Sequence, residues 1–277
     1  MNKTLNIKGK IIDLSTTQLM GILNVTPDSF YSKSRFSVTE VVEKSQQMIA
    51  DGATFIDIGG YSTRPNATDI SIEEELDRVL PVIEEIIKSN PSTIISIDTF
   101  RSEVAKQAIR SGASLVNDIS GGNLDLKMFA TIAELGVPYI LMHSRGNPQT
   151  MSQLNDYQDI TLDTIKEIQA KMYQLQQLNV KDIIIDPGFG FAKNAKQGFE
   201  MMANLEKFAI LGVPLLIGIS RKSMIWKTLG VKPEEALNGT TVLNTIALQK
   251  GASILRVHDV KEAAETVKIW SEVKHFM

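Results

Sequence analysis

Short polar and ionisable side chains stand at the points where apolar runs of this chain stop. The run from Leu19 to Leu23 ends at Asn24, and a polar turn follows it. Seven later runs stop at or next to amides, carboxylates, cations and two of the three histidines. In chain order these positions are the 59–64 segment, Asp98, Asn117 with Asp118, Met142 with His143, Asp186, Arg221 with Lys222, and Arg256 with His258. Amide and carboxylate oxygens accept hydrogen bonds, while guanidinium, ammonium and imidazole groups donate them to anions. If these residues meet in space, they make one polar site that contains both acceptors and cations.

The composition restricts the class of protein. The chain has 277 residues, of which 43% are hydrophobic and 22% charged, as in an ordinary globular protein. Its net charge of −3 gives no general electrostatic footprint for nucleic acid or for an anionic membrane. The absence of cysteine excludes disulfides, thiolate metal sites and cysteine nucleophiles. No segment resembles a signal peptide or a membrane span, so we expect a cytoplasmic protein.

The polar residues follow eight short runs rich in Ile, Leu and Val. These runs are near-continuous rather than alternating, which is typical of parallel strands covered on both faces. They are Leu19–Asn24, Thr54–Gly59, Thr93–Asp98, Ser114–Asp118, Pro138–His143, Asp182–Asp186, Pro214–Ile219 and Ser253–His258. Before them, Leu5–Leu14 alternates around Gly9 and predicts a β-hairpin.

Amphipathic segments separate the eight runs. Capping boxes open two of the predicted helices, at Ser37–Glu40 for a helix that ends near Ala50 and at Ser71–Glu74 for the next one. The other predicted helices are Ser102–Ser111, Leu126–Leu135, Asp159–Leu178, Gly198–Leu211, Pro233–Gln249 and Lys261–Val273. Several of them end in glycine before the next strand, as expected for a helix C-terminus.

Eight strand–helix units without a linker predict one α/β domain with the (β/α)8 TIM-barrel fold over residues 1–277. Residues 1–18 would form a hairpin that closes the base of the barrel. An open doubly wound sheet is the alternative, but no G-x-G-x-x-G motif follows the first strand. Active sites of TIM barrels lie at the C-terminal ends of the strands, so the polar residues should converge there.

Eight motifs at these strand ends resemble those of one family. In chain order they read G-I-L-N-V-T-P-D-S-F, D-I-G-G-Y-S-T-R-P, S-I-D-T-F, V-N-D-I-S-G-G, L-M-H, D-I-I-I-D-P-G-F-G-F-A-K, I-G-I-S-R-K-S and L-R-V-H-D-V. On these residues the chain resembles the dihydropteroate synthases over nearly its whole length. One motif alone would be weak evidence, but eight in the right order, each at a predicted strand end, are specific.

The resemblance implies a function and an assembly. Members of the family are TIM barrels, commonly homodimers, that act in folate biosynthesis and are targets of sulfonamides. They join p-aminobenzoate to 6-hydroxymethyl-7,8-dihydropterin pyrophosphate, form 7,8-dihydropteroate and release pyrophosphate, with Mg²⁺. The implied mechanism is a dissociative substitution through a carbocation that the pterin stabilises. The protein would then contribute electrostatic stabilisation and positioning more than proton transfer. No nucleophilic triad is needed, which fits the absence of cysteine and of a G-x-S-x-G motif.

The resemblance also implies roles for individual residues. The catalytic residues would be Asp98, Lys222, Arg256 and His258. The pterin would be bound by Asp98, Asn117, Met142, Asp186, Lys222 and Arg256. The p-aminobenzoate would be bound by Ser62, Thr63, Arg64, Pro65, Phe191 and Ser223. The diphosphate would be bound by Asn24, Arg256 and His258, with Asn24 also a ligand of Mg²⁺.

Without the resemblance, the same residues have plainer interpretations. Asp98 and Asp186 could cap helices, and Asn24 could start an Asx turn. Arg256 could belong to a structural salt bridge, and Phe191 could be an ordinary core residue. The segment 62–64 could be a solvated loop.

The chain departs from the family pattern in two loops. Tyr31-Ser32-Lys33-Ser34-Arg35 stands where the family has Gly-Gly or Asp-Gly after S-F. In the next loop Tyr61 replaces an acidic residue and Asn66 a glycine. Both loops are expected to close over the substrates, so the departures bear on kinetics and sulfonamide response more than on reaction type.

Three other functions remain as alternatives. A methyltetrahydrofolate-dependent methyltransferase shares the pterin-binding carboxylates but needs no diphosphate site, so Arg64, Lys222-Ser223 and the R-V-H motif argue against it. A non-catalytic paralogue would bind pterin without turnover. A phosphate-binding aldolase barrel is disfavoured because no lysine ends the sixth strand to form a Schiff base.

Overall fold

The computed structural model describes residues 4–25, 35–62, 69–147 and 149–276. Within these residues eight parallel strands form one sheet, in the order β8-β7-β6-β5-β4-β3-β10-β9. The strands are β3 Gln18–Asn24, β4 Phe55–Gly59, β5 Ile94–Asp98, β6 Leu115–Asp118, β7 Tyr139–Met142, β8 Ile183–Asp186, β9 Leu216–Ile217 and β10 Ile254–Val257. A bridge between Ile185 and Leu215 joins β8 to the residue before β9, so the sheet closes into a nearly complete barrel. The predicted TIM-barrel fold is confirmed.

The base of the barrel is filled with apolar side chains. Those near the N-terminal ends of the strands pack with an antiparallel hairpin, β1 Thr4–Ile7 with β2 Lys10–Asp13. The hairpin contributes Leu5, Ile7 and Ile12, and Leu14 follows directly after it. Full burial of one such side chain contributes roughly 1.5–3 kcal/mol. Since this end of the barrel is occupied by apolar residues, the polar strand ends meet at the opposite end.

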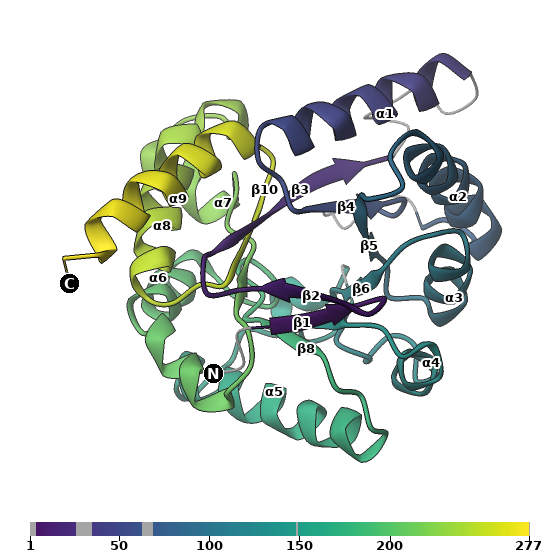
Figure 1. Ribbon diagram of the computed structural model, residues 1–277. Helices are drawn as coiled ribbons and strands as arrows, with labels where there is room; N and C mark the ends of the chain where they lie inside the picture. Colours follow the sequence, from purple (N-terminus) through teal and green to yellow (C-terminus); the bar gives the residue numbers. More distant parts are fainter. Residues whose placement is uncertain (1–3, 26–34, 63–68, 148, 277) are drawn as a thin grey trace.

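Helices surround the barrel (Figure 1). They are α1 Arg35–Ala50, α2 Ile72–Ser89, α3 Ser102–Arg110, α4 Met128–Leu135, α5 Ile160–Gln177, α6 Ala195–Ala203, α7 Ser223–Leu229, α8 Leu237–Gln249 and α9 Val260–Lys274. Short 3-10 helices cover Met151–Gln153, Leu205–Leu211 and Pro233–Glu235. Among the helices of the described ranges, none is long and apolar enough to cross a membrane.

Side-chain caps start α2, α5 and α6, and three of the predicted helices differ from the structure. The predicted start at Ser37 is wrong, because α1 already begins at Arg35. The Ser71 side chain accepts a hydrogen bond from the backbone N–H of Glu74, as the predicted cap requires. The predicted helix Gly198–Leu211 starts earlier than expected and is divided into two segments. A capping box between Asn194 and Gln197 sets the earlier start of α6. The α-helix stops at the non-helical Asn204 and a 3-10 helix follows. Likewise, the predicted helix Pro233–Gln249 is a 3-10 turn followed by α8.

Candidate active site

The strand register brings the polar strand ends side by side. Asn24 at the end of β3 pairs with Gly59 of β4, and Gly59 pairs with Asp98 of β5. Asp98 pairs in turn with Asn117 of β6. Parallel strands in register end at the same rim, so residues far apart in the sequence share one mouth.

Arg256, on β10, lies between two carboxylates at this mouth. Its Nε donates to Oδ2 of Asp57 and its Nη2 donates to Oδ2 of Asp98, both at 2.6 Å. Asp57 is fully buried in β4, and the same Oδ2 accepts a bond of 3.0 Å from the Asn117 amide. Burial alone would lower the pKa of Arg256, but Asp57 and Asp98 offset this and raise it. Arg256 is therefore a permanent cation in a fixed orientation, and its Nη1 makes no hydrogen bond to a described residue.

The environment of Asp98 favours its protonated form. Burial raises the pKa of this carboxyl to about 7, Arg256 opposes the shift, and the nearby carboxylate of Asp57 adds to it. Two carboxylates that share one guanidinium repel each other, so one of them is held close to protonation. The cluster can therefore accept hydrogen bonds from N–H donors of a ligand.

Asp186 ends β8 beside Met142, with which it pairs in the register. Its Oδ1 accepts a bond of 2.8 Å from the backbone N–H of Gly188. Burial raises its pKa, whereas that hydrogen bond and the nearby Lys222 ammonium lower it. Met142 is buried next to this carboxylate and is the apolar side chain that the sequence predicted there.

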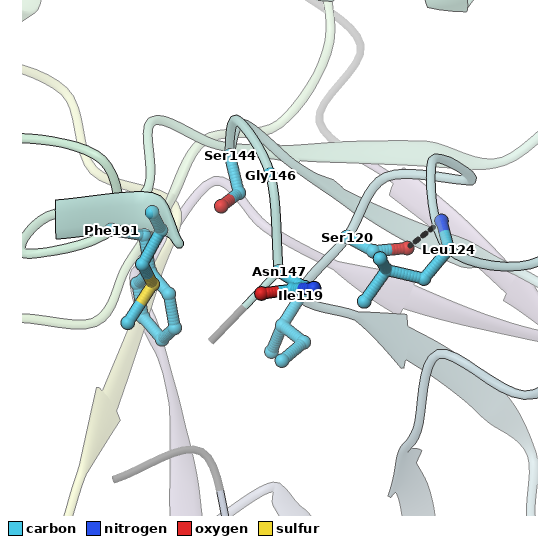
Figure 2. Close-up of a pocket in the computed structure, with 8 residues that line it drawn as sticks. Ile119, Ser120, Leu124, Ser144, Gly146, Asn147 and Phe191 are labelled. Atoms are coloured by element: carbon cyan, nitrogen blue, oxygen red, sulfur yellow. Dashed lines mark hydrogen bonds between the residues drawn. The ribbon is translucent and has the colours of Figure 1, made fainter. Parts of the chain in front are cut away.

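Lys222 lies over the ring of Phe191, with Nζ 4.1 Å from the ring centroid. This is cation–π distance. Burial lowers the pKa of Lys222 to about 8, and Arg256 lowers it further while Asp186 opposes the shift. Ser223, the next residue, is exposed at the start of α7. Phe191 also borders a small hollow between the loops after β6, β7 and β8 (Figure 2), together with Ile119, Ser120, Leu124, Ser144, Gly146, Asn147 and Met151.

His258 is oriented by Ser220, which sequence analysis missed. The Ser220 hydroxyl oxygen accepts from the backbone N–H of His258 at 3.2 Å and lies 3.0 Å from its Nδ1. We assign the hydroxyl proton to this second contact, which leaves the imidazole N–H on Nε2. Partial desolvation and the neighbouring Arg256 lower the pKa of His258, although the residue is exposed at the rim. The ring is thus a neutral donor through Nε2.

Three predicted residues lie outside the described residues: Thr63, Arg64 and Pro65. Ser62, immediately before them, is half-buried. Asn24 is half-buried at the rim, and its side chain makes no hydrogen bond to another residue in the described part of the chain. Its amide oxygen therefore remains a free acceptor within that part.

A family model agrees with this arrangement over most of the chain. The model for pterin binding enzymes matches residues 20–258. The chain belongs to this family. Dihydropteroate synthase of Escherichia coli strain K12 is 41% identical over 265 residues, which cover 95% of this chain and 93% of that protein.

Solved structures of the pterin-binding family superimpose over almost the whole fold. Xanthomonas albilineans dihydropteroate synthase with 4-aminobenzoic acid has a TM-score of 0.90 and 34% identity, covering 99% of each chain. Yersinia pestis dihydropteroate synthase in a sulfonamide drug complex has a TM-score of 0.92 and 37% identity, covering 98% of this chain and 99% of that one. The resemblance inferred from the eight motifs is confirmed.

Asp57 is the main residue that sequence analysis missed. It stands inside the apolar run of β4, two residues before the strand end, so the hydrophobic pattern does not mark it as a site residue. A carboxylate inside a continuous apolar strand was itself a signal, because a buried charge needs a partner. Its partner, Arg256, lies 199 positions away and could not be identified from the sequence.

Two strand-end residues prove to be structural in this member of the pterin-binding family. Asp118 is buried and accepts bonds from the Tyr139 hydroxyl and from the backbone of the following turn. Arg221 pairs with Asp259 at 2.8 Å and donates to carbonyls of residues 233 and 234. Both residues therefore stabilise loops and are not free for a ligand.

The loop departures are only partly described. Residues 31–34 and Asn66 lie outside the described residues. Tyr61 is described: its ring meets Phe100 edge-on at 5.0 Å, and the Arg101 guanidinium lies 5.2 Å from its centroid. Tyr61 thus packs against the residues that follow β5, two positions after Asp98.

Proposed function

We propose that this protein is a dihydropteroate synthase. It condenses 6-hydroxymethyl-7,8-dihydropterin pyrophosphate with p-aminobenzoate to give 7,8-dihydropteroate and pyrophosphate. The observation that carries the proposal is the Arg256 cluster, in which one guanidinium joins Asp57 and Asp98. Membership of the pterin-binding family and similarity to dihydropteroate synthases over more than 90% of the chain support it.

In the proposed complex the pterin lies in the mouth against Asp98, Asn117 and Asp186. Its amino-pyrimidinone edge has several N–H donors, which carboxylate and amide oxygens accept. The Asn117 amide nitrogen donates to Asp57, and its oxygen, to which no described residue donates, is the acceptor left for the pterin. A site of this kind discriminates strongly, because a ligand without those donors leaves buried acceptors unpaired. Met142, Lys222 and Arg256 complete the pterin site.

The proposed chemistry is a dissociative substitution. The bond between the pterin methylene carbon and the diphosphate oxygen breaks, and its electron pair leaves with the diphosphate. Arg256 and the Nε2–H of His258 stabilise the negative charge that develops there. The amine nitrogen of p-aminobenzoate then bonds to the methylene carbon and loses a proton. Lys222, beside Phe191, completes the set of cations around the reacting atoms.

The p-aminobenzoate would lie on the outer side of the pterin. Phe191 offers an apolar wall for its ring, and Ser223 at the start of α7 can hold its carboxylate. Ser62, Thr63, Arg64 and Pro65 form the remainder of this half of the proposed site. Only Ser62 of these four belongs to the described residues.

Mg²⁺ is part of the proposal, with Asn24 as its protein ligand. Within the described residues no cluster of three or more His, Cys, Asp or Glu side chains could hold a metal. The amide oxygen of Asn24, to which no described residue donates, nevertheless fits this ion, because Mg²⁺ is often bound by one or two protein oxygens plus substrate phosphates and water. When bound, the ion would neutralise charge on the diphosphate.

We further propose that the protein is cytoplasmic and forms a homodimer of single-domain subunits. Its partners would be small molecules, and neither nucleic acid nor a membrane. Exposed apolar side chains on two outer helices, Val242 on α8 and Ile269 and Val273 on α9, support association through this face. Light scattering of the purified protein would measure the mass directly, and a monomer would contradict this part.

One assay tests the proposed function. Purified protein is mixed with the pterin pyrophosphate, p-aminobenzoate and Mg²⁺, and dihydropteroate and pyrophosphate are followed. We expect turnover in the wild type and in Asp77→Asn, a control on the exposed side of α2, and none in a folded Asp98→Asn variant. Normal activity of Asp98→Asn would contradict the assignment. Pterin binding without product would favour the non-catalytic paralogue.

A further inference from the structure

The turn of residues 187–193 carries Phe191, and a buried lysine holds it from within. Lys193 is 8% exposed, and its Nζ lies 2.8 Å from His143 Nδ1, 3.0 Å from the carbonyl oxygen of Phe191 and 3.2 Å from that of Gly188. All three partners are acceptors. The ammonium therefore links both ends of the turn to the end of β7.

The turn needs such support because its backbone is tight. Gly188 has a φ of +73°, and a Cβ there would lie 2.0 Å from the carbonyl oxygen of His143. Ala192 has a φ of +51°, which is uncommon for a residue with a side chain. The Tyr157 hydroxyl donates to the Ala192 carbonyl at 3.0 Å. The Phe191 carbonyl is thus held by Lys193 of the same turn, whereas Ala192 and Lys193 are held from outside the turn, by Tyr157 and His143.

Both sets of contacts lead back to Glu167, on α5. One carboxylate oxygen lies 3.0 Å from His143 Nε2, and His143 contacts Lys193 through Nδ1. The other accepts from Arg145 Nε at 3.1 Å, and the Arg145 guanidinium stacks 3.9 Å from the centroid of the Tyr157 ring. One chain of contacts reaches the turn through Lys193 and the second reaches it through Tyr157.

We propose that Glu167 and Lys193 are positioning residues that fix the Phe191 ring under the Lys222 ammonium and so set the affinity for p-aminobenzoate. This inference rests on the proposed function. Neither residue has been given a role in the chemistry above. Both chains of contacts act on the backbone around Phe191. Lys193 donates to the Phe191 carbonyl, and Tyr157 donates to the carbonyl of the next residue, Ala192.

The protonation of the network fits this role. Burial lowers the pKa of His143 to about 4, so its ring is neutral at pH 7 with one proton. Lys193 donates to Nδ1, which leaves that proton on Nε2 facing Glu167. Burial lowers the pKa of Lys193 to about 7 and Asp186 opposes the shift, so the donating ammonium form is populated at and below neutral pH.

A polar network costs more to bury than an apolar core of the same volume. Its advantage is direction: hydrogen bonds fix the carbonyls of the turn, whereas apolar packing would fix only its volume. A site residue is held in a productive geometry only when its supporting residues are themselves locked. Phe191 needs that support because its side chain is only half-buried. The ring contacts Lys222 and also lines the hollow in Figure 2.

Steady-state kinetics of Lys193→Met and Glu167→Gln form the first test. Lys196→Met, an exposed lysine on α6, is the matched control. We expect KM for p-aminobenzoate to rise by about tenfold in each test variant, as for the loss of roughly one hydrogen bond. Both kcat and the dissociation constant of the pterin substrate should stay within about twofold. An unchanged KM for p-aminobenzoate in the folded variants, or an equal loss for both substrates, would overturn the inference.

A second measurement does not depend on turnover. Protein labelled with 4-fluorophenylalanine gives a ¹⁹F NMR resonance for Phe191, which Phe191→Leu assigns by its disappearance. We expect this resonance to shift or broaden in Lys193→Met and Glu167→Gln but not in Lys196→Met, with cooperative melting in all three. An unmoved resonance overturns the inference even if the wild type is active. An inactive wild type would reject the proposed function, while the resonance would still decide the positioning. If Lys193→Met does not fold, Glu167→Gln decides it alone.

Discussion

The Oδ2 atom of Asp57 lies 2.6 Å from Nε of Arg256, across 199 positions of the sequence. Asp57 is fully buried, and its Oδ1 has no hydrogen-bond partner among the described residues. A buried carboxylate of this kind is stabilised by its cation and in turn fixes the direction of the guanidinium. Because Nε and Nη2 of Arg256 are both used, only its remaining edge is left for a substrate.

Replacing Asp57 by Asn should therefore lower kcat/KM by roughly 100-fold, since a displacement of about 1 Å in a positioning group has that size of effect. Arg256 would keep Asp98 as a partner, so the protein should still fold. Steady-state kinetics and a melting curve check the prediction, with Asp77→Asn as the control. A fully active Asp57→Asn protein would show that Asp98 alone orients the guanidinium.

Replacing Ser220 by Ala should reduce kcat while leaving substrate binding nearly unchanged. The Ser220 hydroxyl donates to Nδ1 of His258 and so keeps the imidazole proton on Nε2, the nitrogen that would face the diphosphate. Without it both ring tautomers become accessible, and a loss of roughly tenfold corresponds to one hydrogen bond. Ser92→Ala, at an exposed hydroxyl, is the control. Equal kcat in the two variants would argue against the assigned tautomer.

The proposed magnesium ligand makes a prediction about metal dependence. Removal of Mg²⁺ with a chelator should abolish turnover, and Asn24→Ala should raise the Mg²⁺ concentration needed for half-maximal rate. Saturating metal should restore much of the rate, because the substrate phosphates and water would supply most of the ligands. A rate measured against Mg²⁺ concentration checks this. Identical titrations of wild type and Asn24→Ala would exclude Asn24 as a ligand.

The buried His143 should contribute less to stability in mild acid than at neutral pH. Burial lowers its pKa to about 4 in the folded state, from an ordinary value of 6.5. The unfolded chain therefore binds the proton more readily at this histidine, and the contribution of His143 to stability falls as pH drops from about 6.5 towards 4. At pH 5 the expected loss is about 2 kcal/mol.

Denaturant unfolding of wild type and His143→Gln between pH 7 and pH 5 measures this effect. The variant should lose less stability over that interval than the wild type does. The charged groups that face His143 are Lys193, Glu167 and Lys171. The pKa of Glu167 is lowered to about 2, so its own loss of stability begins near pH 4.5 and lies mainly below this interval. Parallel pH profiles would contradict the prediction.

The strand ends could be predicted because the signals for them are local. Near-continuous Ile, Leu and Val runs identify buried parallel strands, and the polar residue after each run marks its end. Asn24, Asp98, Asn117 and Asp186 were located in this way, and the parallel register then brings them to one rim. Helix starts such as Ser71 were equally local, since a cap acts over three residues.

The pairings at that rim were decided only by the tertiary structure. Asp57 lies inside one of the eight apolar strand runs. The sequence does not say whether its side chain points into the barrel, towards Arg256, or outwards towards a helix. The link from Lys193 through His143 to Glu167 joins three separate elements in the same way. Hydrogen bonds between side chains depend on ångström-scale distances set by barrel closure. The sequence by itself determined which groups reach the mouth; the closed barrel determined which of them hold one another.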